Sequence, residues 1–178
     1  ADEFLVSATS SSGSAVSIAG NGTGCVGSGL SSASITIISG VTTCSITFNQ
    51  AGNSNYSAAS QQTRTVTVSK ATQSITVTAP PPVSAVNGSS FYVEASATSG
   101  NAVTIAASGG CSGAGFNAAD ITMTSNSVTC SIAYSQAGNS NYSAAQAVVT
   151  TTQALSDIDS DGVADSNDNC VAQSNPDQ

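Results

Sequence analysis

The sequence predicts an all-β protein: two small antiparallel β-sandwiches in tandem, followed by a short irregular acidic segment. Three observations support this prediction. A stretch of sequence beginning at residue 49 recurs at residue 135, an offset of 86. Apolar and polar residues alternate in short runs, which is the period of a strand with one buried face. No window shows the 3.6-residue apolar period of an amphipathic helix.

The repeat divides the chain into domains. NQAGNSNYSAA at 49–59 returns as SQAGNSNYSAA at 135–145. A period of this length is too long for one unit of a solenoid, so each copy is expected to be a small domain with its own core. The expected parts are a first domain (1–71), a second domain (72–153) and a C-terminal segment (154–178).

Short alternating runs predict the strands of the second copy, with Gly, Asn, Ser and Pro clusters between them. Six or seven short strands within about 80 residues are typical of an antiparallel sandwich. Proline cannot donate to a ladder, so APPP at 79–82 predicts an irregular connection or a strand switch. The predicted strands are 73–78, 91–97, 102–106, 121–124, 128–134 and 145–150.

The first copy is expected to lack its first strand. Residues 72–90 precede Phe91 in the second copy, whereas three residues precede the matching Phe4. A sandwich without that strand exposes unpaired backbone and an apolar groove, which favours strand addition. Two interpretations remain open. Either the chain starts inside a domain, or a neighbouring subunit supplies the strand and builds a head-to-tail fibre.

The cysteines of each copy predict a disulfide within that copy. Cys25 and Cys44 are 19 residues apart, and so are Cys111 and Cys130. No Cys-x-x-Cys and no His accompany them, so metal binding is disfavoured. Paired cysteines place a protein outside the cytoplasm. Two reduced core cysteines per domain are the alternative, and Cys170 is left over.

These motifs resemble a known kind of domain. Phe-x-Val-x-Ala, a Cys, a second Cys in VTCSI and then QAGNSNYSAA resemble the bacterial immunoglobulin-like repeats of large surface proteins, over about residues 1–153. The resemblance implies two tandem immunoglobulin-like β-sandwiches. It also implies a spacer or stalk role, since such repeats serve mainly in that way.

The C-terminal segment carries a metal-site motif. In a twelve-residue loop that begins at Asp157, carboxylates stand at positions 1, 3, 5, 9 and 12 and Gly at position 6, which is the EF-hand ligand spacing for Ca²⁺. Without a cation, five close carboxylates repel one another. The candidate ligands are the side chains of Asp157, Asp159, Asp161, Asp165 and Asp168 and the main-chain carbonyl of Val163.

The same run departs from an EF-hand, because position 12 is Asp rather than Glu and no amphipathic helix flanks the loop. DxDxDGxxDxxDNC followed by NPDQ instead resembles a thrombospondin type 3 repeat over residues 157–178. That resemblance implies calcium binding by these aspartates and a disulfide from Cys170 to a neighbouring repeat. A disulfide from Cys170 to another subunit is the alternative. Val171 stands where the family usually has Pro. A solvated acidic tail is the alternative.

Composition excludes several function classes. Only 7% of the residues are charged, Arg64 and Lys70 are the only basic ones, and there is no His. This leaves no electrostatic footprint for nucleic acid, no Ser-His-Asp triad and no His-ligated zinc site. No stretch approaches 18 apolar residues, so membrane insertion is not expected. Residues 1–150 hold four acidic and two basic residues, a net −2, so the acidity belongs to the C-terminal segment.

Together these features predict a non-enzymatic, secreted or cell-surface structural protein of bacterial type. It is expected to be a calcium-stabilised rod that acts as a surface stalk, or as a subunit of an extracellular filament assembled head-to-tail by strand complementation. The alternative is an adhesion or polysaccharide-binding accessory module of a larger secreted protein. That role requires exposed aromatic side chains on a sheet face, and only 4% of the residues are aromatic.

Overall fold

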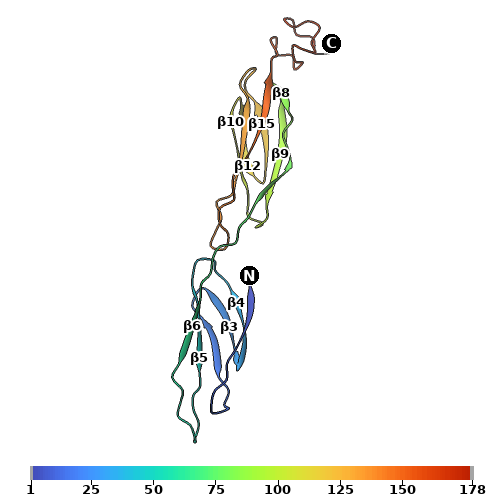
Figure 1. Ribbon diagram of the computed structural model, residues 1–178. Helices are drawn as coiled ribbons and strands as arrows, with labels where there is room; N and C mark the ends of the chain where they lie inside the picture. Colours follow the sequence, from blue (N-terminus) through green and yellow to red (C-terminus); the bar gives the residue numbers. More distant parts are fainter. Residues whose placement is uncertain (1, 177–178) are drawn as a thin grey trace. The chain divides into compact units, whose positions relative to one another are not determined.

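The computed structural model describes residues 2–176 and is all-β, as predicted (Figure 1). None of these residues is helical, so the described chain has no helix that is long and apolar enough to cross a membrane. The fold divides into two compact units. Unit 1 is Ala1–Thr72 with Asn139–Ser143, and unit 2 is Gln73–Gly138 with Ala144–Gln178. The last two residues of the predicted segment 154–178 lie outside the described residues.

Unit 1 is an antiparallel sandwich in which neighbouring strands follow the order β1-β4-β3-β2-β5-β6. The hairpins form because alternating runs such as CSITFN are separated by Gly- and Ser-rich turns. Its strands are β1 (Glu3–Ser7), β2 (Ser17–Asn21), β3 (Cys25–Leu30), β4 (Ser32–Ile37), β5 (Cys44–Asn49) and β6 (Gln62–Val66).

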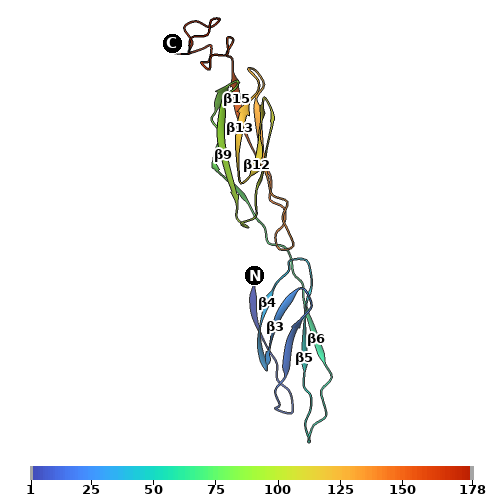
Figure 2. The same ribbon diagram turned by 180° about the vertical axis from the view of Figure 1, so that it is seen from behind.

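Unit 2 repeats this plan with two additional strands, β7 and β8, and with the counterpart of β3 divided into β11 and β12. Its order is β7-β9-β13-β12-β10-β14-β15-β8, and β11 pairs with β13. Figure 2 shows β9 and β13 side by side. The strands are β7 (Ile75–Ala79), β8 (Ser84–Val86), β9 (Ser90–Ala97), β10 (Thr104–Gly109), β11 (Cys111–Ser112), β12 (Ala114–Phe116), β13 (Ala118–Met123), β14 (Cys130–Ser135) and β15 (Val148–Leu155).

One segment of each unit belongs to both layers of its sandwich. The first two residues of β3 pair with β4, and from Gly27 onward the strand pairs with β2. Gly27 has φ +142°, and a Cβ there would lie 2.1 Å from the carbonyl oxygen of Ser34. Gly113, with φ +146°, makes the same transition between β11 and β12. Only glycine tolerates this conformation and this close approach, so both copies keep it.

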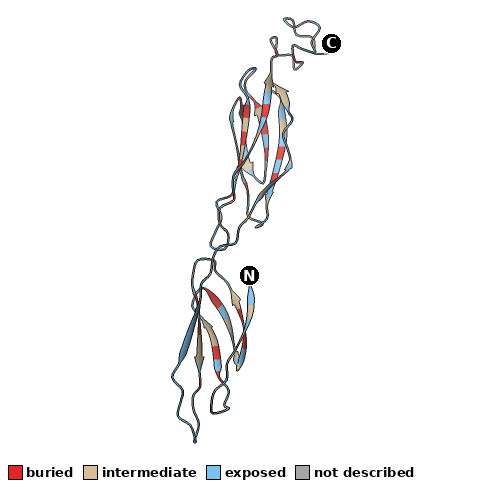
Figure 3. Cartoon of the chain, in the orientation of Figure 1, coloured by how far each residue is buried: buried red, intermediate tan, exposed pale blue. Residues whose placement is uncertain are grey.

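The core of each unit consists of the inward positions of these strands. Along β9, for example, Val93 and Ala95 are buried and Glu94 is exposed, and the same alternation is visible in Figure 3. The unit 2 core includes Val93, Ala95, Val103, Ile105, Ile121, Met123, Ile132 and Tyr134. The unit 1 core includes Val16, Ile18, Ala33, Ile35 and Ile46.

A disulfide joins the two layers inside each unit. Cys25 of β3 bonds Cys44 of β5 with Cα atoms 5.2 Å apart. Cys111 of β11 bonds Cys130 of β14 with Cα atoms 5.0 Å apart. All four residues are buried. These are the pairs expected from the spacing of 19 residues, and the alternative of reduced core cysteines is wrong.

The predicted strand switch at the prolines is present. β7 pairs antiparallel with β9, residues 80–83 are irregular, and β8 then pairs parallel with β15 in the other layer. The strands predicted for the second copy are all found, with ends shifted by a few residues. β8, β11 and β12 were not predicted, because runs of two or three residues carry no readable period.

We expect the double substitution Cys111→Ala with Cys130→Ala to lower the free energy of unfolding of unit 2 by about 3 kcal/mol, since the bond closes a loop of roughly 20 residues. Calorimetric unfolding of the variant and the parent measures this difference. The matched double variant Cys25→Ala with Cys44→Ala should lower the free energy of unfolding of unit 1 by the same amount. Unchanged unfolding of both variants would contradict the stabilising role of these bonds.

Candidate metal centre

The predicted acidic loop begins where the last strand of unit 2 ends. β15 stops at Leu155, and Asp157 follows with its side chain only 1% exposed. The Asn126 side-chain amide donates a hydrogen bond of 3.3 Å to the Asp157 main-chain carbonyl. The first candidate ligand is therefore held against the sandwich, which fixes the start of the loop.

Aspartate side chains shape the loop by accepting hydrogen bonds from main-chain N–H groups further along. Asp157 Oδ2 accepts from Gly162 at 3.1 Å, and Asp159 Oδ1 accepts from Asp161 at 3.3 Å. Asp161 Oδ1 accepts from Val163 at 2.8 Å. Gly162 has φ +96°, a conformation that side-chain-bearing residues rarely adopt, so glycine at the sixth position permits the tight turn.

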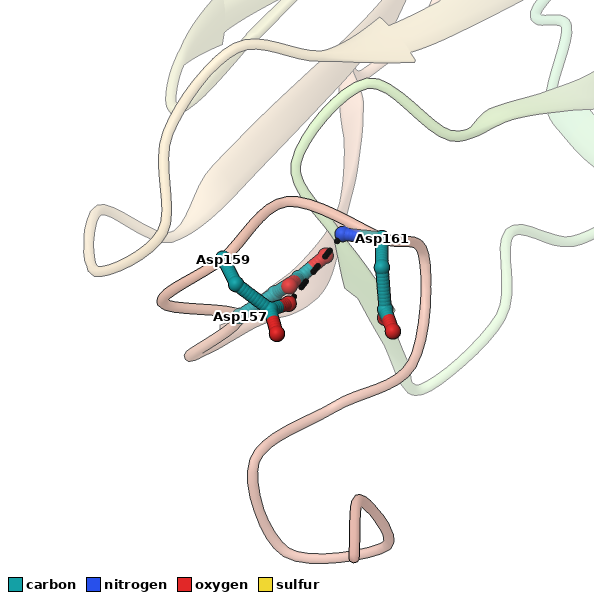
Figure 4. Close-up of side chains that lie close together, drawn as sticks. All are labelled: Asp157, Asp159 and Asp161. Carbon is teal, nitrogen blue, oxygen red and sulfur yellow. Dashed lines mark hydrogen bonds between the residues drawn. The ribbon is translucent and has the colours of Figure 1, made fainter. Parts of the chain in front are cut away.

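Three of the predicted ligands come together in this loop. Asp157, Asp159 and Asp161 each offer a carboxylate oxygen, and these oxygens all lie within 4.8 Å of one another. Figure 4 shows the three side chains within the same turn, with the hydrogen bond from the Asp161 N–H to the Asp159 carboxylate. Burial, reinforced by the charge of Asp161, raises the pKa of Asp159.

Two oxygens of this cluster are buried without a hydrogen-bond partner. They are Asp157 Oδ1 and Asp159 Oδ2. An ionised oxygen removed from water without a donor is destabilising, and a bound cation would remove that cost. Asp157 is almost completely buried, so water does not solvate its unpartnered oxygen. This points to a bound cation separately from the close spacing of the three carboxylates.

The other predicted ligands have different surroundings. Asp165 Oδ1 accepts from the Ile158 N–H at 2.8 Å, and Asp165 Oδ2 accepts from the Ser156 hydroxyl. These two bonds connect the second half of the loop to its start. Asp168 Oδ1 accepts from the Cys170 N–H at 2.8 Å. The charge of Asp168 also contributes to the raised pKa of Asp159.

The sequence prediction did not include Asn175. Its main-chain N–H donates to Asp161 Oδ2 at 2.9 Å, and its side-chain amide donates to Asn169 Oδ1 at 2.7 Å. These bonds fold the chain after Cys170 back over the acidic loop. The sequence feature that could have indicated this role is the NPDQ run after Cys170, which begins at Asn175. Cys170 itself is exposed and forms no disulfide within the described residues, so a disulfide to another chain or repeat stays a prediction.

The donor set suits a hard cation. The clustered atoms are all carboxylate oxygens, which favour Ca²⁺ or Mg²⁺ over the softer metals that select thiolate or imidazole. No protein-family model matches the sequence, and no curated protein matches it. The chemistry of the loop must therefore be judged from its own residues.

In the presence of a chelator, we expect Asp157→Asn to stabilise unit 2 by about 1–3 kcal/mol. The substitution removes a buried charge with an unpartnered oxygen, while an amide oxygen still accepts from the Gly162 N–H. Thermal unfolding in EDTA measures the effect. Asp120→Asn, on an exposed position of β13, is the matched control and should change stability by less than about 0.5 kcal/mol. A destabilised Asp157→Asn variant would contradict the expectation.

Proposed function

We propose that this chain is an extracellular structural protein, of which unit 2 ends in a calcium-binding loop. The observation that carries the proposal is the buried, unpartnered Oδ1 of Asp157 within a cluster of three carboxylates. Bound Ca²⁺ would neutralise that cluster and order the loop, so the protein would be stiffest where calcium is plentiful, as it is outside cells.

The proposed ligand set follows the spacing of the acidic run. Asp157, Asp159 and Asp161 supply the clustered oxygens, and Val163 supplies its carbonyl. Asp165 stands at the ninth position, where calcium loops often bind through a water molecule. This fits a carboxylate whose two oxygens already accept hydrogen bonds from Ile158 and Ser156. Asp168 at the twelfth position completes the set.

The two disulfides support an extracellular location, because such bonds persist in oxidising compartments. The repeated sandwich supports an immunoglobulin-like spacer. Its sequence resembles bacterial surface repeats, and the two layers linked by a disulfide suit a small core with few aromatic residues. We therefore propose a surface stalk, or a subunit of an extracellular filament assembled by strand complementation.

A second candidate function rests on two exposed aromatic side chains of unit 2. Tyr92 of β9 and Phe116 of β12 are 52% and 72% exposed, and Tyr92 pairs with Asp120 of β13. Desolvation of its hydroxyl, together with the charge of Glu94, raises the pKa of Tyr92. Exposed aromatic rings beside carboxylates favour a sugar ligand, and so an adhesion or polysaccharide-binding module. Retention on insoluble glycans that is lost in Tyr92→Ala with Phe116→Ala would favour this function.

The calcium site is tested by titration of the full chain. Ca²⁺ should bind and raise the melting temperature of unit 2, and EGTA should reverse the rise. Asp157→Asn should weaken binding by at least about tenfold, because ligand charge sets the affinity of such loops. Asp120→Asn should bind like the parent. No bound calcium by mass spectrometry, together with an unchanged melting temperature after EGTA, would overturn the calcium assignment.

The assembly state separates the two structural roles. A filament subunit should exceed the 17.3 kDa chain mass in light scattering once Ca²⁺ is added, whereas a stalk module should stay at that mass. A chain that remains monomeric at all calcium concentrations would remove self-assembly into a filament and leave the stalk.

A further inference from the structure

A turn of unit 2 covers its disulfide. Residues 124–129 join β13 to β14, and we call them the covering turn. The Thr124 N–H donates to the Gly110 carbonyl at 2.8 Å. A Cβ on Gly110 would lie 1.8 Å from the main-chain oxygen of Val128. The turn therefore lies directly against the residue before Cys111, and both cysteines of the bond are buried. A thiol reductant reaches such a bond only after the turn opens.

The side chain of Asn126 links the covering turn to the acidic loop, residues 157–168. Its amide donates to the main-chain carbonyl of Asp157 at 3.3 Å. Asp157 is the first candidate ligand, and its Oδ2 accepts from the Gly162 N–H at 3.1 Å. The same carboxylate carries the buried, unpartnered Oδ1. One hydrogen bond thus joins the turn over the disulfide to the best-supported ligand of the candidate metal site.

Unit 1 has the same turn over its own disulfide. Ser39 Oγ accepts from the N–H groups two and three residues later, at 3.3 Å each, and Ser125 Oγ accepts from the equivalent N–H groups at 3.2 and 3.0 Å. A Cβ on Gly24, the residue before Cys25, would lie 2.3 Å from the main-chain oxygen of Thr42. Both cysteines of that bond are buried as well. The two disulfides are therefore covered in the same way.

The link to the acidic loop belongs to unit 2. At the offset of 86 residues, Asn126 and Asp157 correspond to Gly40 and Ala71. Glycine has no side-chain donor, and alanine has no carboxylate to bind a cation. Both ends of the link thus differ between two otherwise matching turns. Unit 1 is therefore an internal reference, because its disulfide is covered by a turn that carries no link to a metal ligand.

We propose that a cation bound in the acidic loop holds the covering turn closed through Asn126, and so protects the disulfide between Cys111 and Cys130 from reduction by thiols. A bound cation fixes Asp157, and the fixed carbonyl of Asp157 retains the amide of Asn126. Opening of the turn breaks this bond and disturbs the metal site, so it becomes rarer by the ratio of the cation affinities of the closed and open states. Asn126 is thus a positioning residue. The inference rests on the proposed calcium site and adds what its occupancy controls.

Hydrogen exchange of the full chain identifies the segment that the cation holds. The Thr124 N–H closes the turn onto Gly110, so its exchange should slow by about fivefold or more when Ca²⁺ replaces EDTA. The N–H of Ile38, which donates to the Gly24 carbonyl at 3.0 Å in unit 1, is the matched reference and should be unchanged. Equal slowing of both amides, or of neither while Ca²⁺ is bound, would overturn the inference.

The reduction rates of the two disulfides test the inference directly. One dithiothreitol molecule gives two electrons and two protons to one protein disulfide, which becomes two cysteine thiols, while the reagent closes to a cyclic disulfide. Alkylation and mass spectrometry follow the two protein disulfides separately. Saturating Ca²⁺ should slow reduction of the bond between Cys111 and Cys130 by about fivefold or more relative to EDTA. It should change reduction of the bond between Cys25 and Cys44 by less than about twofold.

Two variants of the covering turn locate the link. Asn126→Ala removes the donating amide and should abolish the effect of Ca²⁺ on the reduction rate, while calorimetry still detects Ca²⁺ binding. Ser127→Ala, in the same turn, is the matched control and should keep the calcium effect of the parent. A merely structural role of Asn126 would speed reduction equally in Ca²⁺ and in EDTA, so an unchanged ratio of the two rates in Asn126→Ala overturns the inference.

The remaining outcomes separate this inference from the proposed function. A parent chain that binds Ca²⁺ without slower reduction of the unit 2 disulfide overturns the inference and leaves the calcium site. A parent chain that shows no Ca²⁺ binding by calorimetry overturns the calcium assignment and the inference with it. Where Asn126→Ala fails to fold, the hydrogen exchange of Thr124 in the parent decides the question.

Discussion

Each unit depends on a covalent link between its two β-layers. The chain has few aromatic residues, so each sandwich must close over small aliphatic side chains such as Ile35 or Ile121. The disulfide from the crossing strand to the opposite layer holds those layers at a fixed separation, and Gly27 or Gly113 lets the crossing strand reach both. The core and both sheets are organised around that link.

The acidic loop follows a different principle. In the sandwiches, charge is scarce and apolar burial provides the stability. In the loop, carboxylates direct the main chain by accepting its N–H groups, and Asp157 is buried with one oxygen unpartnered. On the proposed function, a bound cation would order this loop, because the loop has no core of its own. The two parts of the chain would then respond to different solution conditions.

The sequence predicted the elements whose signals are local or repeated. Alternation predicted the long strands, the cysteine spacing predicted both disulfides, and the proline run predicted the strand switch. What it did not contain was the role of contacts between distant residues. Asp165 looks like any other aspartate of the loop, yet Ile158 and Ser156 engage it, and Asn175 folds back onto Asp161. Hydrophobic periodicity and residue spacing do not reveal which distant residues form such hydrogen bonds.

The parallel pairing of β8 with β15 has a mechanical consequence. The chain enters unit 2 ahead of β8 and leaves after β15, and the two strands run in the same direction. Tension between these ends pulls the strands in opposite senses along their length, so their hydrogen bonds are loaded together in shear rather than opened one at a time. The Thr152 bond to Pro82 adds to that clamp. In the described part of unit 1, β6 pairs with β5 alone, so this clamp is a feature of unit 2.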